Sequence, residues 1–336
     1  MNNYTKYLLK RLFWYLLTFV IAVSLNFLLP RMIKGNPVSV IVSNLAAGMA
    51  DSNAQKRLYE TFMKEFGLNQ SLFKQYLIYW GNLLHGNLGT SFSLYPKTVS
   101  SILASALPWT IMLQLPAILV GWIVGNLLGA LTAYKRGIYE KTIFPLSLFI
   151  NSIPSFALSI ILLYFFAVHL KWFPTGGGYD YNLMPSLSWQ FISSVLYHYP
   201  LPFLSIVLVM IGGQAIGMRS MSIYELNADY VLYSKLMGVS DSKIVRYVFK
   251  NAVLPQITGL ALSLGTMVSG ALITEIVFNY PGIGTWMFTA IRQLDYPLIS
   301  GCTLMITIAV LAANFLIEII YGLIDPRVKA AQMEEG

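Results

Sequence analysis

The chain has 336 residues, of which 56% are hydrophobic and only 11% are charged. Soluble domains carry about 25% charged residues, so this composition excludes an ordinary soluble fold and favours a protein that lies within a lipid bilayer. The net charge of +8 is carried largely by bases that flank apolar segments. We therefore expect membrane lipids, and no nucleic acid, as partners.

Six apolar segments predict six transmembrane helices. A stretch of about 20 apolar residues crosses a hydrocarbon core roughly 30 Å thick, and a helix satisfies its own backbone groups there whereas an open sheet does not. The sequence therefore predicts an all-α polytopic membrane protein. The expected spans are residues 11–30, 107–133, 143–169, 201–222, 255–278 and 298–323.

Lysines and arginines gather at alternate ends of these spans. Short loops rich in these bases stay in the cytoplasm, so we expect both termini to be cytoplasmic. The bases concerned are Lys6, Lys10, Arg11, Lys135, Arg136, Lys141, Arg219, Lys235, Lys243, Arg246, Lys250, Arg327 and Lys329. The expected parts are a cytoplasmic N-terminus with the first span (1–30), an extracytoplasmic helical segment (31–98), a five-helix core (99–325) and a cytoplasmic tail (326–336).

Residues 31–98 contain two amphipathic patterns that predict helices. Asp51 or Ser52 is a candidate cap for the first helix, and Gly67 ends it. Apolar residues recur at helical spacing in both patterns: Leu58, Phe62 and Phe66, then Leu72, Tyr76, Leu77, Trp80 and Leu84. Such helices can pack on each other or on the outer ends of the spans. They form either a small cap over the helices or a docking surface for an outside partner.

Polar residues in the second and third spans are candidates for a transport pathway. Gln114 and Asn126 interrupt the apolar second span. Pro154 is expected to kink the third helix, and kinks free backbone carbonyls that can line a cavity. Asn151 and Ser152, which precede this proline, are therefore pathway candidates as well.

A polar island separates the fourth and fifth spans at residues 224–254. Asp229 is a good N-cap and Gly238 a good C′ residue, which together bound a helix at 230–237. The helix carries a large apolar and aromatic surface formed by Tyr230, Tyr233, Leu236 and Met237. A helix this short is marginal alone, so it requires something to lie against. The alternatives are a partner protein and an interfacial helix with no partner.

A second helix follows the first, capped by Ser240 or Asp241. It presents one basic stripe and one apolar stripe, and Pro255 marks where we expect the chain to turn into the next span. The basic stripe suits anionic lipid headgroups.

Two acids lie within or at the edge of the last two spans. Intramembrane acids are costly and by default suggest function. Glu275 stands shortly before Tyr280, where the fifth helix must end. It either satisfies backbone groups of the loop or has a gating or substrate role, and Tyr280 is a gate candidate beside it. Glu318 is expected to snorkel or to pair with a base, and Asn314 is a further pathway candidate.

The remaining chemistry of the chain is sparse. Cys302 is expected to pack as a small apolar residue. The histidines at 85, 169 and 198 lack metal-ligand spacing, and no nucleophile–base set is visible. We therefore expect no metal site, no cofactor and no catalytic residue in this chain.

Short motifs occur in order along the whole chain: Lys10-Arg11-Leu12, Gly35-Asn36-Pro37, Phe66-Gly67-Leu68-Asn69-Gln70, Trp80-Gly81-Asn82-Leu83, Ile153-Pro154-Ser155-Phe156, Asp229-Tyr230-Val231, Tyr280-Pro281-Gly282 and Asp325-Pro326-Arg327. Their collinear set resembles the oligopeptide/dipeptide branch of binding-protein-dependent ABC importer permeases. The Glu-Ala-Ala triplet of the general permease pattern is replaced by Leu232-Tyr233-Ser234, and the spacing from Gly238 to Leu254-Pro255 is long. Both departures are similar to what that branch shows.

The resemblance implies the transmembrane subunit of a type I importer in a bacterial or archaeal cell membrane. A homologous second permease subunit, two ABC ATPases and an extracytoplasmic solute-binding protein would complete it. ATP and magnesium would be used by the ATPases, since no phosphate loop is present in this sequence. The residues implied to couple to the ATPases are Asp229, Tyr230, Tyr233, Leu236, Met237, Gly238 and Ser240.

Two questions stay open at the level of sequence. The first is the substrate, for which the resemblance favours oligopeptides ahead of short oligosaccharides. The second is the energy source, because an ion-coupled secondary transporter using Glu275 or Glu318 is an alternative. The segment Ile211-Gly212-Gly213-Gln214 is similar to part of the ATPase signature, but it lies inside an apolar span. We therefore expect it to serve helix packing through small residues.

Overall fold

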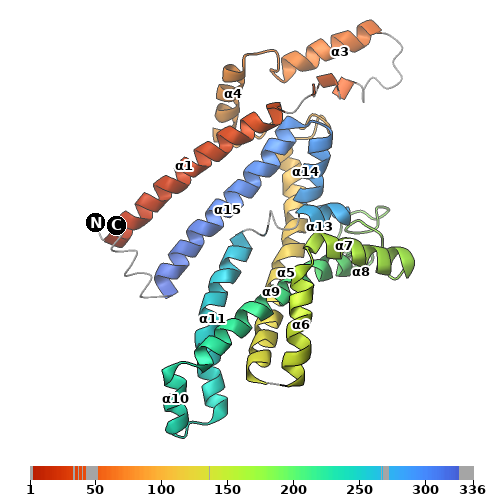
Figure 1. Cartoon of the computed structure of the whole chain (residues 1–336). Coiled ribbons are helices and arrows are strands. Elements are labelled where there is room, and N and C mark those ends of the chain that lie inside the picture. Colours follow the sequence, from red (N-terminus) through yellow and green to blue (C-terminus); the bar gives the residue numbers. More distant parts are fainter. Residues whose placement is uncertain are drawn as a thin grey trace. The chain divides into compact units, whose positions relative to one another are not determined.

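The computed structural model describes residues 3–32, 35–36, 38–39, 41–42, 52–135, 137–265, 267 and 272–324. Regular structure in these ranges is helical, apart from one isolated bridge between Thr90 and Thr98. The helices group into two compact units, and Figure 1 shows the elements of each. Unit 1 holds the described residues of Met1–Pro108, Gly282–Phe315 and Tyr321–Gly336, and unit 2 holds Trp109–Pro281 and the described residues of Leu316–Ile320.

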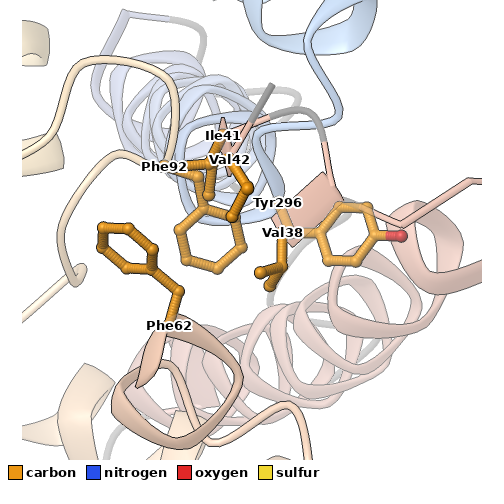
Figure 2. Close-up of a cluster of buried hydrophobic side chains, with 6 residues drawn as sticks. All are labelled: Val38, Ile41, Val42, Phe62, Phe92 and Tyr296. Carbon is orange, nitrogen blue, oxygen red and sulfur yellow. The ribbon is translucent and has the colours of Figure 1, made fainter. Parts of the chain in front are cut away.

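Unit 1 contains α1 (Asn3–Met32), α3 (Ser52–Glu65), α4 (Leu72–Leu84), the start of α5 (Val99–Tyr134), α14 (Ile283–Arg292) and most of α15 (Tyr296–Ile324). Phe62 of α3 belongs to a buried apolar cluster that also contains residues from other segments of unit 1 (Figure 2): Val38, Ile41, Val42, Phe62, Phe92 and Tyr296. Leu58 and Phe66 pack against this cluster. The periodic residues of the first amphipathic pattern therefore face a core, as their spacing predicts.

Helix α4 packs on α1 through aromatic rings. The ring of Phe27 lies 5.2 Å from that of Tyr76 and 5.4 Å from that of Tyr79, measured between centroids. The hydroxyl groups of Ser24 and Tyr76 add a hydrogen bond of 2.7 Å. The second amphipathic helix therefore lies against the end of a predicted span, and its bounds match the predicted run from Leu72 to Leu84.

Unit 2 contains the rest of α5, α6 (Ile138–Ser152), α7 (Ser155–Leu162), the π-helical turn η1 (Leu163–His169), α8 (Trp189–His198), α9 (Pro200–Leu226), α10 (Asp229–Leu236), α11 (Asp241–Gly265) and α13 (Leu272–Val277). Helix α9 packs against α6, α7 and α11.

Glycines bring α5 and α6 close to α9. A side chain at Gly125 of α5 would collide with Gln214 and with the carbonyl of Ile211. A side chain at Gly212 of α9 would likewise collide with the carbonyl of Ser147 in α6. The prediction that Ile211–Gln214 serves packing through small residues is therefore confirmed.

Four helices among the described residues are long and apolar enough to cross a bilayer: Lys6–Met32, Val99–Tyr134, Pro200–Leu226 and Tyr296–Leu316. They correspond to the first, second, fourth and sixth predicted spans. The third predicted span, 143–169, corresponds to α6 and to α7 with η1, which together are long and apolar enough to cross a bilayer but are bent by 98° at the break between Ser152 and Ser155. Ile153 is extended (φ −88°, ψ 121°), as a residue before proline prefers, so Pro154 breaks the helix.

The fifth predicted span, residues 255–278, corresponds to the end of α11 and to α13, with 266 and 268–271 outside the described residues. The expected turn at Pro255 is wrong, because α11 runs without a break from Asp241 to Gly265. A proline inside a helix removes one backbone hydrogen bond, and helices in membranes tolerate that loss. The count of six spans stays a prediction.

Candidate functional sites: the 224–254 loop and the buried Glu275

The helix α10 is ended by a glycine in the left-handed conformation. Gly238 has φ +74°. Its N–H donates to the carbonyl of Lys235 at 3.0 Å, and the N–H of Val239 donates to the carbonyl of Ser234 at 3.0 Å. This pair of bonds is the Schellman motif, so the predicted role of Gly238 is confirmed and only a glycine fits there without strain.

The start of α10 differs from the prediction by one residue. Ala228 occupies the N-cap position with ψ 148° and makes no side-chain cap, while Asp229 is the first helical residue. The predicted N-cap role of Asp229 is therefore wrong. Its carboxylate lies instead in the first turn, where the helix dipole favours a negative charge. The helix covers 229–236 where 230–237 was expected.

One side of α10 is anchored in unit 2. Val231 is 1% exposed and packs with Ile244 and Val248 of α11. Tyr134 from the end of α5 packs on the same cluster, and its hydroxyl donates to the carbonyl of Val245 at 3.3 Å. The short helix is therefore held by two longer helices.

Polar contacts fasten the same region. The Glu225 carboxylate accepts a hydrogen bond from the Tyr230 hydroxyl at 2.7 Å and from the Asn251 amide at 3.3 Å. Burial, followed by the bond to Glu225, raises the pKa of Tyr230. Tyr230, a predicted coupling residue, therefore holds α10 to Glu225 at the end of α9. Ser240 precedes α11, and its carbonyl accepts the N–H of Lys243 at 2.9 Å.

The other side of α10 is bare and apolar. Leu236 is 75% exposed, Met237 82%, Tyr233 66% and Leu232 59%. Contiguous exposed apolar surface on a protein commonly marks an interaction site. Leu232 was absent from the predicted coupling residues, although its spacing of four from Leu236 places both on one helical face.

Glu275 of α13 is fully buried in unit 2. Its Oε1 accepts a hydrogen bond of 2.7 Å from the hydroxyl of Thr110 in α5. The N–H of Tyr280 donates to the carbonyl of Glu275 at 2.8 Å, so the chain turns back at the end of α13. This geometry brings the two predicted gate residues, Glu275 and Tyr280, together.

An aromatic cluster surrounds Tyr280. The ring of Trp109 lies 5.7 Å from that of Tyr280 and stacks at 5.5 Å on Tyr179. The backbone N–H of Gly177 donates to the carbonyl of Phe278 at 2.7 Å, which ties the loop before α8 to the end of α13. The Tyr280 hydroxyl is buried and has no hydrogen-bond partner among the described residues.

The other pathway candidates lie apart from Glu275 in sequence and contacts. Pro154 stands at the bend between α6 and α7. The Asn151 side chain lies against Gly213 of α9, and the hydroxyl of Ser152 donates to the carbonyl of Phe149 at 2.7 Å. Gln114 is buried in α5. The side chain of Glu318 and the motif at 325–327 lie outside the residues that the structure describes.

A buried acid that the sequence analysis missed is Asp295, in unit 1. Its Oδ1 accepts the N–H of Leu298 at 3.1 Å, which caps α15. Its Oδ2 accepts the N–H of Ser93 at 2.9 Å and hydroxyl hydrogen bonds from Ser93 and Ser91. An aspartate directly before a long apolar run was an available signal for a cap. Nothing in the sequence indicated its hydrogen bonds to Ser91 and Ser93, which lie about 200 residues earlier in the chain.

Metal chemistry receives no support from the described part of the chain, where no group of three or more histidine, cysteine or acidic residues could hold an ion. His85 and His198 each contact a main-chain carbonyl through Nδ1. The pattern is that of a polytopic helical membrane protein with a protruding, apolar loop helix.

Comparison with known proteins identifies the family of this membrane protein. Residues 125–330 match the family described as the binding-protein-dependent transport system inner membrane component. The chain is 31% identical over 338 residues to the di/tripeptide transport system permease protein of Pseudomonas aeruginosa, covering 96% of this chain and 98% of that protein. It is 28% identical to the oligopeptide transport system permease protein of Bacillus subtilis, covering 91% and 93%. It is also 28% identical to the dipeptide transport system permease protein of Escherichia coli K12, covering 96% and 98%.

The chain therefore belongs to the binding-protein-dependent transport system inner membrane component family. The resemblance to ABC importer permeases of the oligopeptide/dipeptide branch is confirmed, and so is the all-α fold class of a type I permease. With its apolar helices, the chain is an integral membrane transport component.

Proposed function

We propose that this chain forms half of the translocation pathway of a peptide importer and is driven through α10 by separate ABC ATPase subunits. A homologous second permease subunit forms the other half, and an extracytoplasmic solute-binding protein delivers the solute. ATP and Mg²⁺ are bound by the ATPases, and this chain carries out no catalysis. Both termini lie in the cytoplasm of a bacterial or archaeal cell, on the side of α10.

The bare apolar face of α10 carries the proposal. Leu236 and Met237 are among the most exposed apolar side chains described, on a helix whose opposite side is anchored. Burying each side chain against a partner contributes about 1.5–3 kcal/mol. A short amphipathic helix inserted in a groove is a recurring mode of protein recognition. A helix that only lies at the membrane interface needs no such anchoring, whereas a helix that transmits the motion of a partner must be fixed to the rest of its own chain.

Peptides are the proposed substrate because the three relatives compared above are named for di/tripeptide, oligopeptide and dipeptide transport. This favours peptides over short oligosaccharides. The proposed mechanism is alternating access. ATP-driven closure of the ATPases moves the 224–254 loop, and α9 and α11 transmit the movement to the region of Glu275 and Tyr280.

The docking surface is tested by placing a charge on it. Leu236→Glu and Met237→Glu should each weaken ATPase binding at least tenfold, because tenfold corresponds to about 1.4 kcal/mol and a buried, unpaired carboxylate costs more. Leu84→Glu on α4, where the leucine is 79% exposed, is the matched control. The measurement is co-purification of the ATPases with each full-length variant after confirming equal membrane abundance. ATPases retained at the wild-type level by both loop variants would refute the assignment.

The energy source is tested separately. Peptide uptake into proteoliposomes containing the complete importer should require internal ATP and persist when the proton gradient is collapsed. Uptake that persists without ATP and stops with the gradient would establish an ion-coupled secondary transporter instead.

A further inference from the structure

A cavity in unit 1 has the size and lining of a small-ligand site. Its volume is about 440 Å³, and it lies among the end of α1, the turn after α3, α4, the loop after α4 and the start of α15. Pockets that hold small ligands fall in the range of about 300–1,000 Å³. The cavity is separate from the residues proposed above for coupling and gating.

A half-buried arginine forms one wall of the cavity. The Arg31 guanidinium stacks on the ring of Phe27, with Cζ 3.7 Å from the ring centroid. Its Nη1 donates to the carbonyl of Phe27 at 2.7 Å, and its Nε donates to Oε1 of Gln75 at 3.2 Å. These contacts hold the group rigidly and use two of its five N–H donors.

No carboxylate among the described residues forms an ion pair with Arg31. Of the charged residues that line the cavity, Lys64 adds a second positive charge and Glu65 a negative one. The Glu65 carboxylate accepts the hydroxyl of Tyr95 at 3.1 Å. The lining therefore has an excess of positive charge, and a charge removed from water is stabilised by an opposite charge within hydrogen-bonding reach.

Two polar atoms of the lining residues are buried without a partner among the described residues: Oε1 of Gln70 and the hydroxyl of Tyr79. Burial raises the pKa of Tyr79, and Arg31 and the Asn26 amide lower it, but no group in the described part of the chain reaches its hydroxyl with hydrogen-bonding geometry. A buried polar group without a partner costs about 1–3 kcal/mol. Gln70 Oε1 requires a donor, and Arg31 requires an acceptor.

We propose that this cavity binds the C-terminal end of a short peptide. The terminal carboxylate is held by the free N–H groups of Arg31, the geometry in which arginine binds carboxylates best. The preceding peptide N–H donates to Gln70 Oε1. Leu68 and Ile78, which also line the cavity, accommodate the terminal side chain. A lipid phosphate satisfies the arginine but supplies no peptide N–H for Gln70.

No residue that lines this cavity is among those proposed for coupling or gating, and its occupation can be measured without transport. It therefore goes beyond the proposed function and is tested by binding alone. The full-length chain, in nanodiscs of phosphatidylcholine and without ATPases or binding protein, is titrated with fluorescently labelled trialanine bearing either a free C-terminus or a C-terminal amide. The expected result is at least tenfold weaker binding of the amide.

Three variants locate the site. Arg31→Gln should weaken the free acid at least tenfold and abolish the preference for acid over amide. Arg31→Lys, which keeps the charge but loses the planar fork, and Gln70→Leu, which leaves the arginine in place, should each weaken the acid about tenfold. Lys74→Gln on α4, a lysine that is exposed and absent from the cavity lining, is the control and should bind like the unaltered chain.

Three outcomes overturn the proposal. The first is a preference for the free acid that persists in the folded Arg31→Gln variant, or an unchanged affinity for the free acid in the folded Gln70→Leu variant. The second is equal binding of acid and amide by the unaltered chain. The third is displacement of both peptides by phosphatidylglycerol added to the nanodiscs, which assigns the cavity to a lipid headgroup. Peptide uptake by the complete importer is measured in parallel, so that failure of this site and failure of the proposed transport function are distinguished.

Discussion

The close approach of α5 and α9 leads to a sharp prediction about Gly125. A Cβ added at this residue would lie 2.6 Å from Cβ of Gln214 and 2.8 Å from the carbonyl oxygen of Ile211. Both atoms are fixed by the α9 backbone, so no side-chain rotation relieves the overlap. Gly125→Ala therefore forces the two helices apart by roughly half an ångström or more. Overpacking of this kind costs about 1–3 kcal/mol.

The magnitude is the difference between two opposing effects. Replacing glycine by alanine inside a helix stabilises it by up to about 1 kcal/mol, so the net loss at Gly125 is about 1–2 kcal/mol. Gly81 of α4 is the matched control, because no atom lies within 4 Å of a Cβ built there. Gly81→Ala should stabilise by about 0.5–1 kcal/mol. The two variants should thus differ by roughly 2 kcal/mol.

Thermal unfolding of the purified chain in detergent, followed by tryptophan fluorescence, measures this difference. At about 2–4 °C per kcal/mol for a chain of this size, the transition of Gly125→Ala should lie roughly 5 °C below that of Gly81→Ala. Equal or reversed midpoints would show that α5 and α9 do not meet at Gly125. The reasoning on glycine-mediated packing of unit 2 would then be wrong.

Three further predictions concern polar contacts. Asp295→Ala removes a helix cap and leaves the Ser93 N–H without its acceptor, and should lower the free energy of unfolding by about 3 kcal/mol; a loss below 1 kcal/mol in urea titration would contradict this. Thr110→Val deprives Glu275 of a hydrogen bond and should cost about 1.5–3 kcal/mol, whereas Thr110→Ser should retain most of the stability in the same titration. Tyr230 has a raised pKa, so its contribution to stability is present below the unfolded pKa of about 10 and is lost as the pH rises through the folded value. Tyr230→Phe should abolish this alkaline loss of stability in thermal scans from pH 8 to 11. An unchanged dependence of the unfolding midpoint on pH would refute the role of the Tyr230 hydroxyl.

Local patterns predicted the short helices α4 and α10 well. The apolar run from Leu72 to Leu84 was predicted, and α4 has the same bounds, because apolar periodicity is a local property. Gly238 was identified from its type alone, since a helix that ends in the left-handed conformation selects glycine. The exposed face of α10 was also predicted from the sequence, except that Leu232 was missed and Tyr230 lies on the anchored side.

Predictions that depended on tertiary context failed. At Pro154 the expected kink is a break of 98°, while at Pro255 the expected turn is a continuous helix. Ile153 before Pro154 is extended, whereas Leu254 before Pro255 lies inside α11, and the sequence does not distinguish the two prolines. Asp295 shows the same limit, because three of the four hydrogen bonds to its carboxylate come from a loop about 200 residues earlier.

The construction of α10 explains how a helix of eight residues could carry force under the proposed function. A rigid lever must be fixed on one side and free on the other. Val231, at 1% exposed, fixes α10 to α11, and Tyr134 adds the end of α5 to the same cluster. Met237 at the other side is 82% exposed. Movement of a partner bound to the exposed face is therefore transmitted to both α11 and α5. Weakening the anchor by Val231→Ala should then reduce transport coupling even though no residue of the docking face has changed. ATP hydrolysis that stays fully coupled to uptake in that variant would show that the anchor is structural only.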